Sequence, residues 1–206
     1  MGHIPLHVET AINLAKNTKA GMNIGDKIST VEYSREYNRD PVTNMPFMQT
    51  SMRCPHPDPQ EDHLKIMIFA NHELLGLLKL RQLDVYVDAT FDCVPHPFTQ
   101  CLIFMIYHRE TSSYVPIVYA LMDSKCKEAY WHVFNQIVVL SQWKLQVNTY
   151  CTDFERALLD QMKIQFGGPN GGTHIGCFFH LKQAWRKYLI EKCHTDRETV
   201  KVAMQV

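Results

Sequence analysis

The chain has 206 residues, which is enough for one full domain and an extension. Hydrophobic residues make up 46% of it, as in a globular protein with a real core. Its 21 basic and 21 acidic residues balance, so the overall charge gives no sign of a nucleic-acid binder, although a local basic patch would suffice for one.

Neither a membrane span nor a secretion signal is expected. The longest apolar runs, such as Cys101 to Tyr107, are far shorter than a membrane span, and the N-terminus lacks a basic region followed by an apolar stretch. The 7 cysteines are odd in number and scattered. This pattern predicts free thiols in a reducing compartment, the nucleus or the cytoplasm.

Residues 1–62 are expected to form an irregular N-terminal extension. The segment from Val8 to Lys19 has the pattern of a short helix. Beyond it, dense prolines among polar residues argue against regular structure. They are Pro41, Pro46, Pro55, Pro57 and Pro59. From residue 63 the apolar pattern becomes dense, so we expect a second domain over 63–206.

Within 63–206 the pattern predicts an α/β fold. An apolar run with β-formers at 64–70 and a helical turn at 72–80 come first. Five strands are then expected, at 83–91, 98–108, 114–122, 146–152 and 174–178, and three helices, at 128–143, directly after Asp153 and at 180–192. The order β-β-β-α-β-α-β-α is that of a ribonuclease H-like fold, with a mixed five-stranded sheet and helices on its faces.

Two aspartates end apolar, strand-like runs. Asp88 closes the first expected strand, and Asp153 follows the fourth, directly before a helix pattern. In a ribonuclease H-like fold these two strands are neighbours, which would bring both carboxylates together. Such oxygen ligands suit Mg²⁺ or Mn²⁺, and two-metal sites drive phosphodiester chemistry. From spacing alone the alternative stays open that Asp88 merely ends a strand and Asp153 caps a helix.

Four segments, in order along the chain, resemble Mutator-like element (MULE) transposases. The segments are similar to the family's Asp-Gly-Thr-Phe strand, its third strand, its second acidic motif, and its Cys-x-x-His motif with a basic helix. They are 87–91 (Val-Asp-Ala-Thr-Phe), 115–122, 152–158 and 176–187. Ala89 stands where the family usually has Gly, a mild change that leaves the Asp88 carboxylate in place.

The resemblance implies a metal-dependent enzyme of DNA transposition and recombination. Asp88 and Asp153 would be catalytic, metal-binding members of an Asp-Asp-Glu triad that holds Mg²⁺ or Mn²⁺ in a two-metal site. The domain would cut a DNA strand and join the freed end to target DNA. Its partner would be double-stranded DNA, as transposon ends and as target, and it could form a homo-oligomer.

The Cys-x-x-His motif and the basic helix are open to two interpretations each. Cys177 and His180 could be half of a zinc site, but two ligands do not close one, and we favour a buried strand cysteine and a polar residue at the helix start near the acidic centre. On the helix that follows, Lys182, Arg186 and Lys187 could contact DNA phosphates. A solvated helix face explains them equally well.

The third acid of the triad is expected to be absent from this chain. Glu191 lies 38 residues after Asp153, but it falls about eleven residues into the last expected helix, roughly 16 Å from its start. We therefore expect a domain truncated at its C-terminus. Glu155 is interpreted as an acid in the first turn of a helix rather than as a ligand.

Three functions follow from this interpretation. The first is a transposase-derived nuclease and strand transferase. The second is a catalytically inactive or domesticated remnant that binds DNA or protein. A ribonuclease H-like exonuclease is disfavoured, because those enzymes use Asp-x-Glu on the first strand and Thr90 stands where Glu is needed.

Overall fold

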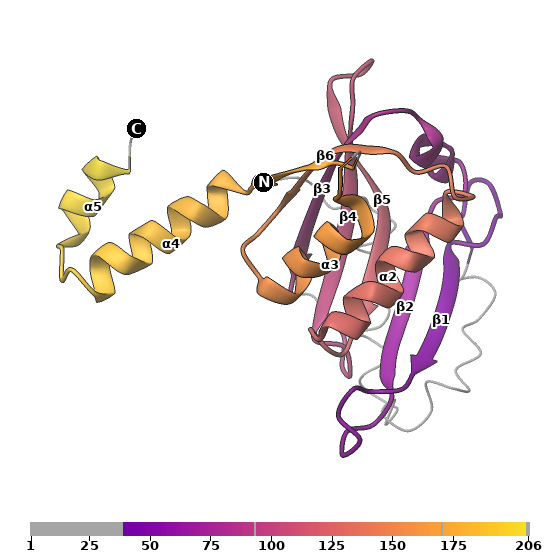
Figure 1. Ribbon diagram of the computed structural model, residues 1–206, viewed down its shortest axis with the longest axis horizontal. Coiled ribbons are helices and arrows are strands. Elements are labelled where there is room, and N and C mark those ends of the chain that lie inside the picture. The colour runs from indigo at the N-terminus through magenta and orange to yellow at the C-terminus, as the bar shows by residue number, and fades with distance from the viewer. Residues whose placement is uncertain (1–38, 93, 170, 205–206) are drawn as a thin grey trace.

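The computed structural model describes residues 39–92, 94–169 and 171–204, so the helix expected at 8–19 lies outside the described residues. The described chain is a mixed α/β fold built on one seven-stranded sheet (Figure 1). The strands are β1 (Met48–Cys54), β2 (Leu64–Ala70), β3 (Leu83–Thr90), β4 (Gln100–His108), β5 (Ser113–Met122), β6 (Val147–Thr152) and β7 (Thr173–Gly176).

The strands lie in the order β1-β2-β5-β4-β3-β6-β7. In this order, every pair of neighbouring strands from β1 to β3 is antiparallel, and β4 and β5 form a hairpin. The β3–β6 and β6–β7 pairs are parallel. The first and fourth of the strands expected from the sequence are therefore neighbours, as predicted.

Two α-helices cover one face of the sheet. They are α2 (Lys127–Leu140) and α3 (Arg156–Phe166), which pack against each other over the strands (Figure 1). Alternate residues of β3, Val85 and Val87, point into the core that these helices complete. Fully buried side chains from the strands and helices fill it, among them Phe104, Ile106, Tyr130, Phe134, Ile137 and Met162.

The last two helices do not cover the sheet. α4 (Phe178–Glu191) and α5 (Arg197–Ala203) form an arm that projects from the side of the sheet (Figure 1). No residue of α4 is buried. The expectation of helices on the faces of the sheet is thus met only by α2 and α3, on one face. None of the described helices has the length and apolar character needed to span a membrane.

The sheet is wider than the five strands expected, because β1 and β2 extend it beyond β5. β2 is the apolar run at 64–70, and its central residues are buried. β1 lies inside the segment expected to be irregular, and that expectation is wrong for Met48–Cys54. An edge strand pairs on one side only and keeps many side chains in solvent, so polar composition and flanking prolines hid it from the sequence pattern.

Candidate active site

The parallel pairing of β3 with β6 places the two predicted aspartates side by side. Tyr86 pairs with Cys151 in this ladder. Continuing this register by two residues aligns Asp88 with Asp153, which directly follows the last residue of β6. Because side chains alternate between the faces of a strand, Asp88 points away from the face on which Val87 is buried. Both aspartates therefore lie at the same end of the β3–β6 pair, where Asp153 begins the turn into α3.

Both carboxylates keep oxygen atoms available. The Asp88 side chain is 52% exposed. Its Oδ1 accepts a hydrogen bond of 2.9 Å from the backbone N–H of Ala89. Oδ1 of Asp153 accepts a 3.1 Å hydrogen bond from the N–H of Glu155, in the turn before α3. Asp153 thus stabilises the turn that precedes the helix, and this local role uses one of its two oxygens.

The chemistry of this pair suits a hard divalent cation. Mg²⁺ binds through one or two carboxylates, keeps several waters and completes its shell with substrate phosphates. Asp88 and Asp153 would supply the protein oxygens of such a shell. Within the described ranges, no group of three or more His, Cys, Asp and Glu side chains lies close enough to hold a metal. The described residues therefore offer two carboxylates at this end of the sheet.

Cys177 and His180 face different neighbours. The thiol of Cys177 is hydrogen-bonded with that of Cys151, and the pKa of Cys151 is raised to about 11, first by burial and then by Cys177. Nε2 of His180 lies 3.8 Å from Oδ1 of Asp88, whereas its Nδ1 is buried and has no hydrogen-bond partner within the described ranges. His180 is thus a polar residue at a helix start beside the acidic pair.

The comparison with protein families covers this site. The family model for the MULE transposase domain matches residues 85–184, from β3 into α4. Residues 85–184 form a MULE transposase domain. The resemblance inferred from the four motifs is thereby confirmed, and the matched range includes both aspartates, Cys177 and His180. No curated protein and no solved structure gives a significant match.

A buried polar network supports the Asp153 side of the MULE domain. The Tyr130 hydroxyl donates a 2.7 Å hydrogen bond to Oε1 of Glu155, and Nε2 of Gln100 donates one of 3.1 Å to the same hydroxyl. Burial, with Glu155 adding to it, raises the pKa of Tyr130 far above its ordinary value. Glu155 therefore faces α2 and anchors the turn that carries Asp153.

Sequence reasoning missed this network. The one sign of the network in the sequence was Gln100, a polar residue within an apolar strand. Gln100 is fully buried in the structure. A buried amide needs a hydrogen-bond partner, but the sequence does not show that this partner is Tyr130. Nζ of Lys125 extends the network, since it lies 3.9 Å from Oε2 of Glu155 and 3.9 Å from the centroid of the Phe91 ring.

The remaining predicted residues lie on the arm, which continues beyond the matched range. Lys182, Arg186 and Lys187 all belong to α4, beyond the sheet. Glu191 is the last residue of α4. At a rise of 1.5 Å per residue it lies about 20 Å from the start of the helix. The structure therefore brings His180 to the acidic pair but places Glu191 at the outer end of a projecting helix.

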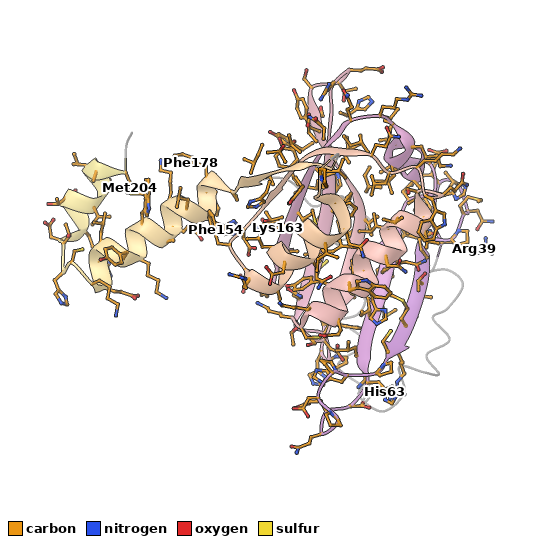
Figure 2. The ribbon with its side chains drawn as sticks, in the orientation of Figure 1. Arg39, His63, Phe154, Lys163, Phe178 and Met204 are labelled. Atoms are coloured by element: carbon orange, nitrogen blue, oxygen red, sulfur yellow. The ribbon has the colours of Figure 1, made fainter. Side chains whose placement is uncertain are left out.

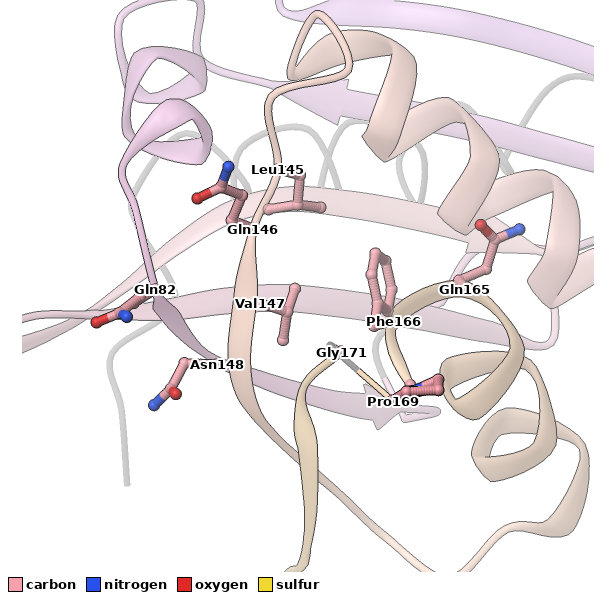
Figure 3. Close-up of a pocket in the computed structure, with 11 residues that line it drawn as sticks. Gln82, Leu145, Gln146, Val147, Asn148, Gln165, Phe166, Pro169 and Gly171 are labelled. Atoms are coloured by element: carbon pink, nitrogen blue, oxygen red, sulfur yellow. The ribbon is translucent and has the colours of Figure 1, made fainter.

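A hollow of about 690 Å³ lies at the other end of β6 (Figure 3). Amide side chains and the glycine-rich loop line it, including Gln82, Gln146, Asn148, Gln165, Gly168 and Gly171. This loop ends α3, because the N–H of Gly167 donates a hydrogen bond of 3.0 Å to the carbonyl of Lys163, and Gly168 has a φ of 110°. None of the described residues that line the hollow is charged. The hollow lies at the start of β6, whereas Asp153 follows the end of that strand.

Proposed function

We propose that the MULE domain has a ribonuclease H-like fold and carries out metal-dependent DNA strand cleavage and strand transfer. The observation that supports this proposal is the parallel β3–β6 register, which aligns Asp88 with Asp153 when it is continued by two residues. The strand order β5-β4-β3-β6-β7 supports the fold, since it joins three antiparallel strands to two parallel ones.

In this proposal Asp88 and Asp153 hold Mg²⁺ or Mn²⁺ through their carboxylate oxygens. The bound ions would neutralise the phosphate and lower the pKa of the attacking water or 3′-hydroxyl. His180 would orient Asp88 by a hydrogen bond, because its Nε2 is already 3.8 Å from Oδ1. Tyr130 would hold the neighbouring turn through Glu155, which keeps Asp153 opposite Asp88.

The family to which this domain belongs implies DNA as the partner. We propose double-stranded DNA, as transposon ends and target, in the nucleus. Lys182, Arg186 and Lys187 would contact its phosphates, because cations on a projecting helix can reach a backbone that lies beside the acidic pair.

The second candidate is a catalytically inactive or domesticated remnant that binds DNA or protein. Two observations favour it. Glu191 ends α4 at the outer part of the arm, and the described residues bring no third acid to Asp88 and Asp153. In this case the fold and the basic arm would serve to bind DNA or protein, and the two carboxylates would be inherited from an active transposase without a catalytic role.

Nicking of supercoiled plasmid tests the two candidates. With Mn²⁺, we expect slow nicking by the wild-type chain and none by Asp88→Asn or Asp153→Asn. Asp160→Asn is the matched control, because this aspartate lies on α3 and pairs with Lys127 and Arg156 instead. Equal nicking by all four proteins would overturn the proposal. DNA binding without nicking by any of them would favour the remnant.

A further inference from the structure

The arm exposes large aromatic side chains. Phe178, Phe179, Trp185 and Tyr188 are 60%, 63%, 52% and 61% exposed, and Figure 2 shows Phe178 on α4, away from the sheet. Isolated helices below about 12–15 residues are marginal in water, and most helical stability in proteins comes from a packed face. A helix of this length without a buried residue therefore presents a surface that fits a binding partner.

Cations alternate with these rings along α4. Nζ of Lys182 lies 5.3 Å from the centroid of the Phe178 ring. Arg186 follows Trp185 directly, and Lys187 precedes Tyr188. Glu191, at the last position, is the one acidic residue of this helix. The exposed rings therefore lie in a positively charged setting.

The spacing sets three of the rings on one side of the helix. Trp185 follows Phe178 by seven residues and Tyr188 follows Trp185 by three, which are the intervals of a single helical face. From Phe178 to Tyr188 the face is about 15 Å long. At 3.4 Å per nucleotide this corresponds to about four nucleotides of one DNA strand.

We propose that this face of α4 binds single-stranded DNA. Unpaired bases would stack on Phe178, Trp185 and Tyr188, while Lys182 and Arg186 contact the phosphates between them, the combination by which proteins hold single strands without sequence preference. The inference rests on the proposed function, because strand cleavage frees DNA ends whose terminal bases can unpair.

A nucleic acid fits this surface better than a second copy of the chain. Lysine is depleted from protein–protein interfaces, whereas here Lys182 sits against one of the exposed rings. Two copies of α4 packed against each other would also bring like charges together, which is unfavourable. A single DNA strand supplies both the bases for the rings and the phosphates for the cations.

The test uses three fluorescent ligands with the full chain in EDTA, so that no metal site is needed. They are an oligo-dT of about 20 nucleotides, a blunt duplex of the same length, and an abasic strand that keeps the phosphates but lacks bases. We expect the wild type to bind oligo-dT at least about tenfold more tightly than the abasic strand, since each stacked base contributes about 1–3 kcal/mol.

Variants separate stacking from charge. Trp185→Ala with Tyr188→Ala should weaken oligo-dT binding at least about tenfold and leave the abasic strand unchanged. Trp185→Phe with Tyr188→Phe should retain the preference. Trp143→Ala is the control, because this tryptophan is 73% exposed and lies outside the arm. Circular dichroism would verify that each variant keeps the wild-type helix content.

Two results would overturn the inference. One is equal binding of oligo-dT and the abasic strand by the wild type. The other is a dimer that the Trp185→Ala and Tyr188→Ala changes convert to a monomer while DNA binding stays the same, which would assign the surface to a second copy. Asp88→Asn should keep oligo-dT binding. Absence of nicking would therefore count against the proposed function, and absence of the single-strand preference would count against the inference about α4.

Discussion

Asp84 and Asp88 lie on the same face of β3, and the fold treats them differently. Asp84 accepts hydrogen bonds from Asn148 at 3.0 Å, Thr149 at 2.8 Å and Arg109 at 2.9 Å, and its side chain is 19% exposed. It joins β3 to β6 and to the β4–β5 turn. The protein itself satisfies this carboxylate, which marks it as a structural group.

Asp88, four residues further along, has far fewer protein donors. Its side chain is 52% exposed, and among the described residues its contacts are the N–H of Ala89 and, at 3.8 Å, the ring of His180. A carboxylate with free oxygens opposite a second carboxylate is what an external cation requires. The contrast on one strand separates an aspartate that holds the sheet together from one kept available for a ligand.

The largest effect should come from Asp84→Ala. It removes three hydrogen bonds to a charged group, and we expect a loss of about 3 kcal/mol in the free energy of unfolding. Asp88→Ala, on the same strand and face, should change it by less than about 0.5 kcal/mol. Urea denaturation of both variants measures the difference. Equal losses would show that the two aspartates do not have separate roles.

Metal binding should depend on Asp88 and Asp153 and not on Asp84. At a Mn²⁺ concentration of about 100 times Kd, we expect the wild type to gain about 2.7 kcal/mol of stability. Asp84→Asn should keep this gain, and Asp88→Asn with Asp153→Asn should lose it. Calorimetric titration and thermal unfolding with and without Mn²⁺ provide the measurement. An unchanged titration in the double variant would remove the metal site from the proposal.

Part of the loss of stability in acid should come from Asp84. Burial alone would raise its pKa, but hydrogen bonds from Asn148, Thr149 and Arg109 bring the pKa below its ordinary value. Its stabilisation is therefore complete above the unfolded pKa of about 3.9 and is lost as the pH falls through the lower folded pKa. We expect a smaller acid-induced loss in Asp84→Asn than in the wild type. Parallel curves of stability against pH would contradict this.

The sequence predicted the strands that carry the site, for a physical reason. β4 is buried on one face and largely half-buried on the other, and its sequence is a nearly continuous apolar run. The order of the strands then sufficed to predict that β3 and β6 are neighbours, as the β3–β6 ladder shows. β1 escaped prediction because an edge strand carries no such run.

Side-chain contacts between residues far apart in the chain could not be predicted from the sequence. The bond from Tyr130 to Glu155 depends on how α2 packs against α3, which no local pattern encodes. The apolar stripe of α4 was visible as a pattern, but helical periodicity does not tell whether a stripe is covered. Its exposed Trp185 and Tyr188 became evident only from the direction in which the arm leaves the sheet.

The chain of contacts from Gln100 through Tyr130 to Glu155 has an evolutionary consequence. It ties the start of β4, whose register with β3 sets the place of Asp88, to the turn that carries Asp153. The spacing of the two carboxylates is thus held from inside the core, where substitutions are costly. A lineage that lost the chemistry would conserve this spacing through selection for folding alone, long after the arm had drifted to another use.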